Sequence, residues 1–73
     1  MKKYAIIDQI KNGDQFEETF DTEAEAVNRS GSEWDRMSEH DKKRREWYAV
    51  VECELNEDGC ADLNTATIIK VYK

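Results

Sequence analysis

Apolar positions in the first part of the chain predict two strands joined by a tight turn. Residues 3–10 read KYAIIDQI and carry apolar side chains on both faces of an extended strand. Residues 15–20 return as a second strand, with Phe16 and Phe20 on one face and polar side chains on the other. The Asn-Gly pair at positions 12–13 suits the turn, because both residues tolerate a positive φ. We expect the first strand near the centre of a sheet and the second at a charged edge.

The middle of the chain predicts one long helix followed by one short helix. A capping box, Thr-Glu-Ala-Glu at positions 22–25, starts a helix over about residues 23–37. Serine and glycine around Gly31 let this helix approach a sheet closely, but they are poor helix formers. A kink at Gly31 is therefore an alternative to a continuous helix. The similar pattern Ser-Glu-His-Asp at positions 38–41 predicts a short helix over about residues 39–46.

The last part of the chain predicts two further strands. Residues 47–55 alternate between an apolar face that begins at Trp47 and a mixed face that begins at Tyr48. Residues 65–72 form the last strand after a polar turn. We therefore expect one α+β domain over residues 1–73, with about four antiparallel strands in ββααββ order and both helices packed on one face of the sheet. The first and last strands have apolar side chains on two sides and are the candidates for the sheet centre.

The charge of the chain is segregated along its length. The net charge of −6 comes from acidic residues that dominate positions 8–25 and 46–62, and the basic run KKRR at positions 42–45 lies between them. A protein that binds nucleic acid or an anionic membrane in bulk would normally be basic, so the net charge counts against both. The apolar run at positions 4–7 is too short for the core of a signal peptide, and no segment is long enough to span a membrane. We expect a cytoplasmic protein.

No residue pattern points to catalysis, a metal or a cofactor. His40 is the sole histidine and lies inside a capping pattern, which predicts an exposed polar residue. Cys53 shares the apolar face of its strand, and Cys60 lies in a turn. We expect reduced thiols, with a disulfide as the alternative for an exported protein. The turn around Asp58 offers oxygens for calcium but lacks the spacing of an EF-hand loop. We therefore expect no catalytic, cofactor-binding or metal-binding residue and a protein that is not an enzyme.

The basic run at positions 42–45 and the aromatic residues beside it form the candidate contact surface. Cations at the end of a short helix complement its negative end, so a solvated face is one interpretation. Lysines that neutralise phosphates beside a stacking ring would instead suit nucleic acid, although the acidic flanks would repel a polyanion. Trp34 and Trp47 are expected to pack together in the core, and Tyr48 to be exposed. The expected partner-binding residues are Arg36, Lys42, Lys43, Arg44, Arg45 and Tyr48.

Two phrases of the chain carry a resemblance to a known group of proteins. These are FDTEAEA at residues 20–26 and the more specific EWDRMSEHDKKRREWYAVVE at residues 33–52. From Tyr4 onward the chain is thereby similar to a family of small uncharacterised α+β proteins of gut Firmicutes and their mobile elements. The Ser-Gly-Ser interruption at residues 30–32 departs from the family pattern. The resemblance implies a cytoplasmic α+β miniprotein, favours an accessory or inhibitor role, and brings no activity or site residues.

We expect a small cytoplasmic, non-enzymatic protein-interaction module whose partner is another protein. A homodimer is also open, because a second copy could complete an apolar edge or helix face. One alternative function is nucleic-acid binding through the basic run at positions 42–45. Another is mimicry of a phosphate backbone by acidic side chains. Those acidic residues are Glu17, Glu18, Glu23, Glu25, Glu52, Glu54, Glu57 and Asp58.

Overall fold

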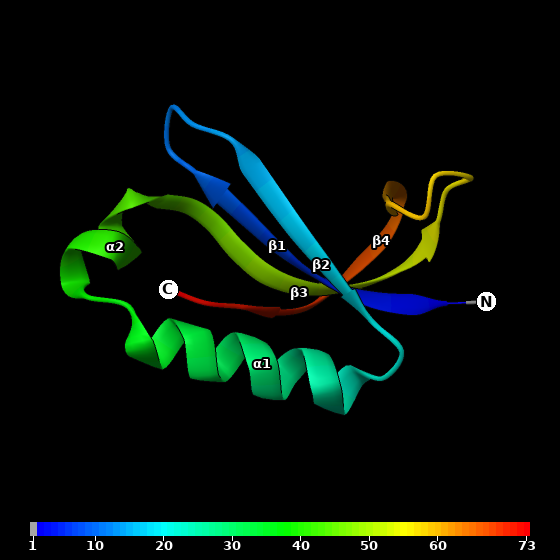
Figure 1. Cartoon of the computed structure of the whole chain (residues 1–73), viewed down its shortest axis with the longest axis horizontal. Helices are drawn as coiled ribbons and strands as arrows, with labels where there is room; N and C mark the ends of the chain where they lie inside the picture. Colours follow the sequence, from blue (N-terminus) through cyan, green and yellow to red (C-terminus); the bar gives the residue numbers. More distant parts are fainter. Residues whose placement is uncertain (1) are drawn as a thin grey trace.

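A single antiparallel sheet with two helices forms the structure. The computed structural model describes residues 2–73, and Figure 1 shows α1 along one face of the sheet and α2 at one end. The α+β class and the ββααββ order predicted from the sequence are confirmed. The elements are β1 (Lys3–Ile10), β2 (Gln15–Phe20), α1 (Glu23–Arg36), α2 (Glu39–Arg44), β3 (Arg45–Leu55) and β4 (Ala61–Val71).

The sheet has the strand order β2-β1-β3-β4, so β1 and β3 occupy its centre. The predicted central place of the last strand is therefore wrong. The tight turn after β3 places β4 beside it, and the two-helix connection from β2 brings β3 to the free side of β1. As an edge strand, β4 leaves Ile68 and Val71 exposed, whereas the middle of β3 is buried on both faces.

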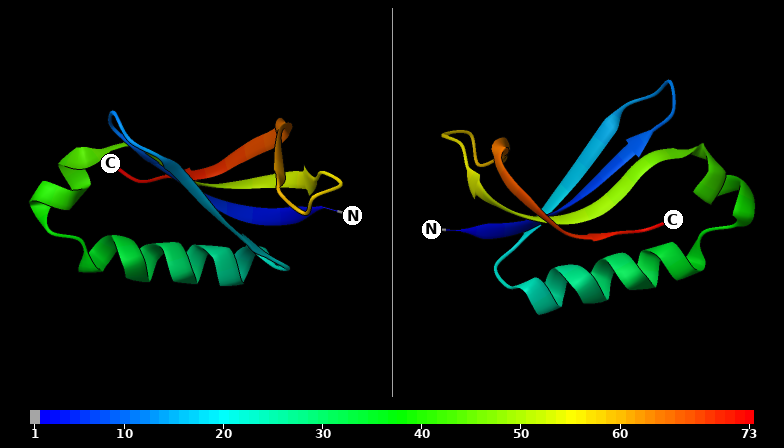
Figure 2. Two further views of the ribbon diagram at one scale, coloured as in Figure 1. Left: turned by 45° about the horizontal axis from the view of Figure 1, so that its top comes forward. Right: turned by 180° about the vertical axis from the view of Figure 1, so that it is seen from behind.

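One face of the sheet packs against α1. Ile6, Tyr48 and Val50 of the sheet are buried together with Ala26 of the helix. The helix begins where the capping box predicts, since the Thr22 hydroxyl accepts a hydrogen bond from the Glu25 amide at 3.2 Å. The helix is therefore fixed both by its local cap and by its contact with the central strands, which the two views of Figure 2 show from other sides.

Small residues bring α1 close to the end of β4. Ser30 is fully buried, and its hydroxyl oxygen lies 2.8 Å from the hydroxyl oxygen of Tyr72. A Cβ added at Gly31 would lie 3.6 Å from the same Tyr72 hydroxyl. The helix continues through Gly31 without a break, so the alternative of a kink is not realised.

The other face of the sheet has a buried cluster of its own. Ala5, Ile7, Val51 and Cys53 are buried there with Ala61, and Trp47 and Ala66 pack against them. Two register shifts between β3 and β4 curl the outer strand, and Figure 2 shows the resulting bend of the sheet. Trp47 thus lies on the face away from α1. The prediction that the two tryptophans pack together is wrong, because β3 turns Tyr48 toward Trp34 instead.

Replacing Gly31 by alanine should stabilise the protein. The substitution removes the helix penalty of glycine, and the new methyl group finds ordinary contact distance, so the free energy of unfolding should rise by about 0.5–1 kcal/mol. Gly59→Ala is the matched control, because Gly59 has φ +81° and an alanine there should cost about 1 kcal/mol. Urea unfolding followed by circular dichroism measures both changes. A loss of stability in Gly31→Ala would contradict the continuous helix and its spacing to Tyr72.

Candidate functional site

An open groove of about 440 Å³ lies where α2, the start of β3 and the end of β4 meet. We call it the basic groove. Glu39 and Glu46 contribute carboxylates to its walls, and Val71 contributes an apolar side chain. Its remaining walls combine cationic and aromatic side chains, and these are Lys42, Lys43, Arg45, Lys73, Trp34, Trp47, Tyr48 and Tyr72. The groove therefore presents positive charge next to flat apolar surface.

Three aromatic rings stiffen one side of the basic groove. The ring centroids of Trp34 and Tyr48 are 5.5 Å apart and stacked, and Tyr72 meets these two rings at 5.5 Å and 5.4 Å. The Lys42 ammonium lies 5.3 Å from the centroid of Trp34, and the Lys70 ammonium lies 4.8 Å from that of Tyr72. Each contact of this kind contributes about 0.5–1 kcal/mol at an exposed site. The rings and two of the cations are thus held in place before any ligand arrives.

Tyr48 is buried, so the prediction that it is an exposed contact residue is wrong. Its side chain is 1% exposed, and its hydroxyl donates to Glu33 Oε2 at 3.0 Å. Burial, followed by this hydrogen bond, raises the pKa of the Tyr48 phenol far above its usual value. Glu33 is itself held by Arg29, whose Nε donates at 2.7 Å. The nearby glutamates of β3 made this face look polar in the sequence, but α1 covers it.

Arg45 lines the basic groove and also has a structural role. Its Nε lies 2.8 Å from Asp8 Oδ1, and both side chains are largely shielded from water. Neither atom has a hydrogen-bond partner elsewhere among residues 2–73, so each serves as the counter-charge of the other. Arg45 Nη1 also donates to the Asp41 carbonyl at 3.3 Å. The guanidinium thus fastens the end of α2 to β1, and its charge is already paired where it lines the basic groove.

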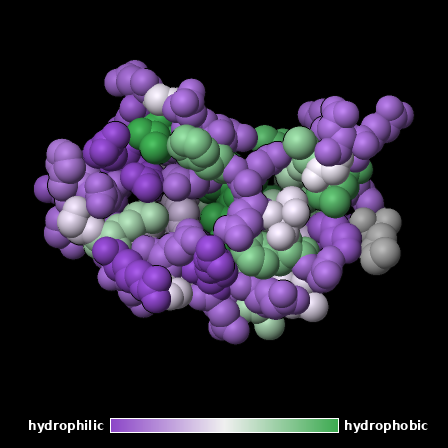
Figure 3. All heavy atoms as spheres, in the orientation of Figure 1, coloured by the Kyte–Doolittle hydropathy of each residue, from purple (hydrophilic) through white to green (hydrophobic). Residues whose placement is uncertain are grey.

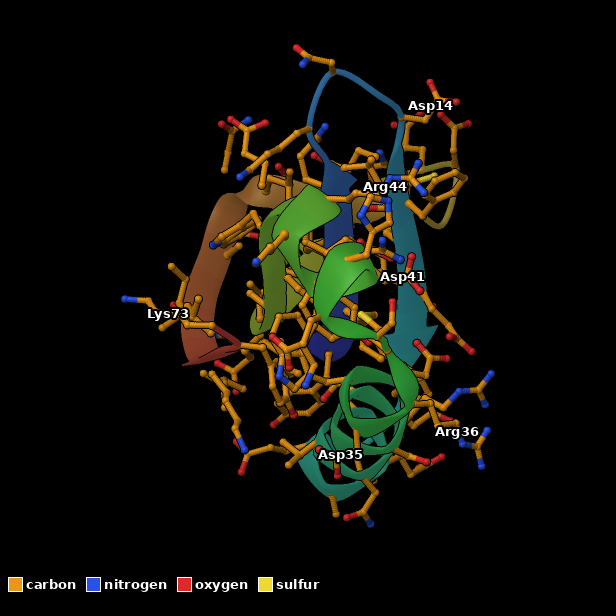
Figure 4. All side chains as sticks on the ribbon, turned by 90° about the vertical axis from the view of Figure 1, so that its left-hand side faces the viewer. Asp14, Asp35, Arg36, Asp41, Arg44 and Lys73 are labelled. Atoms are coloured by element: carbon orange, nitrogen blue, oxygen red, sulfur yellow. The ribbon has the colours of Figure 1, made fainter. Side chains whose placement is uncertain are left out.

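The other predicted cations lie on two sides of the molecule. Lys42 and Lys43 line the basic groove. Figure 4 shows Arg36 and Arg44 pointing toward the β2 side, and Lys73 pointing toward the opposite, β4 side. Of the predicted set, Lys42, Lys43, Arg45 and the buried Tyr48 line the groove, Arg36 and Arg44 do not, and the structure adds Lys73. The sequence carries no local signal for Lys73, because only the pairing of β4 with β3 brings it there.

Two further pockets among residues 2–73 differ from the basic groove in their lining. One of about 290 Å³ is lined by Lys3, Asp21 and Glu25 together with Thr19, Phe20 and Leu55. A smaller pocket of about 150 Å³ between β2 and α1 is lined by Phe16 and several carboxylates. The acidic residues considered for phosphate mimicry are spread over β2, the start of α1, β3 and the turn after β3. Glu52 already accepts a hydrogen bond from Tyr4 at 3.2 Å. Figure 3 shows one face of the molecule as largely hydrophilic, with separated apolar patches.

Titratable and thiol side chains do not gather into a metal site in residues 2–73. His40 is exposed on α2. Both cysteines are free; Cys60 is exposed, and Cys53 is buried, which raises the pKa of its thiol. Within the same described part of the chain, no helix is long and apolar enough to cross a membrane.

Comparisons with family models, with curated proteins and with solved structures find no match to the chain. Function is therefore inferred from the geometry of the basic groove.

Breaking the Asp8–Arg45 ion pair should destabilise the protein. Asp8→Asn leaves the shielded guanidinium without its counter-charge, so the free energy of unfolding should fall by about 2–3 kcal/mol, somewhat less than for a fully buried pair. Arg44→Met is the control, because it removes an exposed cation and should change the free energy of unfolding by less than about 0.5 kcal/mol. Arg45→Met and the double variant Asp8→Asn with Arg45→Met complete a double-mutant cycle, which measures the coupling energy between the two side chains. Equal stability of Asp8→Asn and Arg44→Met would show that solvent already screens the pair.

Tyr48 should make stability fall at high pH. An exposed phenol ionises near pH 10, whereas the pKa of Tyr48 is raised in the folded protein. The unfolded chain therefore loses this proton first, so the contribution of Tyr48 is complete below about pH 10 and declines as pH rises above that value. Thermal melts at about pH 8 and about pH 11 should show a larger loss for the wild type than for Tyr48→Phe. An equal loss would mean that Tyr48 ionises as freely in the folded protein as in the unfolded chain.

Proposed function

We propose that the protein is a small, non-enzymatic interaction module that binds an acidic segment of a partner protein in the basic groove. One observation carries the proposal, namely that unpaired cations and rigid aromatic rings share one open groove. Lys42, Lys43 and Lys73 form no ion pair within the described residues 2–73. Their charge is therefore available to carboxylates that come from outside.

The size and charge of the groove favour a peptide over a nucleic acid. A volume of about 440 Å³ accommodates a few side chains, and apolar side chains of a partner would pack on Trp34 and Trp47. Glu39 and Glu46 also line the groove, and the net charge of the chain is −6. A continuous polyanion would meet these negative charges, whereas a peptide can place its carboxylates only where the lysines lie.

A cytoplasmic setting is part of this proposal. The free thiols of Cys53 and Cys60 fit a reducing compartment. A module of this kind would act by covering an acidic surface of its partner. This mode of action suits an accessory or inhibitor protein of a mobile element.

Charge reversal on the two sides of the molecule tests the proposal. The ligand is a fluorescein-labelled peptide in which Asp alternates with Val and Phe, and anisotropy measures its binding. Lys42→Glu with Lys43→Glu should weaken binding by at least about tenfold, which corresponds to about 1.4 kcal/mol. Arg36→Glu with Arg44→Glu makes the same change of charge away from the groove and should leave the dissociation constant within about twofold.

The outcomes that contradict the proposal are equally specific. Loss of binding in the Arg36 and Arg44 variant alone would place the contact surface on the β2 side. Tighter binding of an oligo-dT strand than of the peptide, with a steep salt dependence, would assign the groove to single-stranded nucleic acid. No binding of the acidic peptide even at low salt would remove the proposed function.

A further inference from the structure

Among residues 2–73, β4 has an outer edge that no other strand pairs with, and this edge reaches the basic groove. β4 is the last strand in the order β2-β1-β3-β4. The Tyr72 amide donates to the Tyr48 carbonyl at 2.9 Å, so Tyr72 directs its backbone groups toward β3. Backbone direction alternates along an antiparallel pair, which turns the amides of Val71 and Lys73 away from β3. Val71 and Lys73 both line the basic groove. Outward-facing backbone donors therefore lie at the mouth of the groove.

The two edges of the sheet differ in charge. Along the β2 edge, Glu17 and Glu18 are exposed and an acidic strand would be repelled. Along the β4 edge, Lys70 and Lys73 are exposed. Figure 4 shows Lys73 extending outward past β4. An acidic extended segment is therefore attracted to β4 and excluded from β2.

The side chains of β4 also alternate in a way that suits an amphipathic strand. Ile68 is 56% exposed and Val71 is 36% exposed. The register shift between Val50 and Val51 leaves Ile69 as an extra residue, so Ile68 and Val71 both lie on the face away from α1. Lys70 lies on the opposite face beside the Tyr72 ring. A strand with apolar side chains on one face and carboxylates on the other would match both faces.

We propose that the acidic partner segment binds as a fifth strand on the outer edge of β4. The segment pairs with the outward backbone groups of Val71 and Lys73, and its carboxylates face Lys70 of β4 and the lysines of the groove. This inference rests on the proposed function, because it specifies how the acidic segment enters the basic groove. Backbone pairing supplies affinity, and the alternating side chains supply selectivity, as in other cases of strand addition.

Peptide N-methylation separates strand addition from simple binding in the groove. Two versions of the Asp, Val and Phe peptide carry methyl groups on alternate amides, one on the set that would face β4 and the other on the opposite set. Their side chains are identical. In an antiparallel fifth strand whose apolar side chains lie on the face of Ile68 and Val71, the amides of Val and Phe meet β4, and in a parallel strand the amides of Asp do so. We expect methylation of the facing set to weaken binding by at least about tenfold and methylation of the other set by less than about threefold. Equal affinity of the two versions would overturn strand addition while leaving the proposed function intact. No binding of the unmethylated peptide would remove both.

Variants at Val71 test the same contact from the protein side. Val71→Pro removes the outward amide and keeps the hydrogen bond of Tyr72 to β3, and proline is tolerated on edge strands. The proline variant should bind the unmethylated peptide at least about tenfold more weakly than the wild type does. Val71→Thr keeps the amide, and its dissociation constant should stay within about threefold of the wild-type value. Retained binding by a folded Val71→Pro variant would overturn the proposal. If that variant does not fold, the methylated peptides decide.

Sedimentation velocity over a range of protein concentrations tests whether the edge is free. We expect a monomer whose β4 edge is available to the peptide. A dimer that the acidic peptide cannot dissociate, and that Val71→Thr preserves while Val71→Pro abolishes, would assign the edge to a second copy and overturn the proposal.

Discussion

Tyr48 connects β3 with α1 and with the end of β4, and the rest of the structure depends on this contact. Its ring stacks on Trp34 of α1 and meets Tyr72 beyond β4, and its hydroxyl donates to Glu33. A buried hydroxyl without an acceptor costs about 1–3 kcal/mol, so this hydrogen bond fixes which turn of α1 lies over β3. The position of α2, and hence of the lysines that it carries, follows from where α1 ends. The basic groove is therefore a consequence of how Tyr48 is buried.

Local signals predicted the elements well, because each depends on a few neighbouring residues. The bounds of β1 and β2 follow from their apolar pattern and the turn at Asn12, and the helix start follows from the Thr22 cap. The faces of β3 could not be predicted in the same way. The centre of this strand is apolar on both sides, and nothing in the sequence says which side meets the helix. The start of β4 was placed too late, because the irregular pairing between Asp62 and Thr67 interrupts its alternation.

The contact surface was predicted only in part, because the sequence does not show in which direction each side chain of the basic run points. Four consecutive cations look like one patch in the sequence, but successive residues of a helix point about 100° apart. Lys42 and Lys43 consequently line the groove with unpaired charges, and Arg44 points elsewhere. Arg45 also lines the groove, but it begins a strand and pairs with Asp8. Lys73 joins the groove through strand pairing alone. A cluster in the sequence thus became a groove built from segments that are far apart along the chain.

The central pairing of β1 with β3 has a consequence for the synthesis of the chain. Lys3 lies opposite Cys53, so β1 meets its second partner only after the residues between these two positions have been made. The β1–β2 hairpin has local contacts and can form early, but Ala5 and Ile7 stay uncovered until β3 arrives. Loop closure over this separation slows folding relative to a helical bundle of the same length. β1, β2 and α1 therefore cannot complete their packing before β3 has been made.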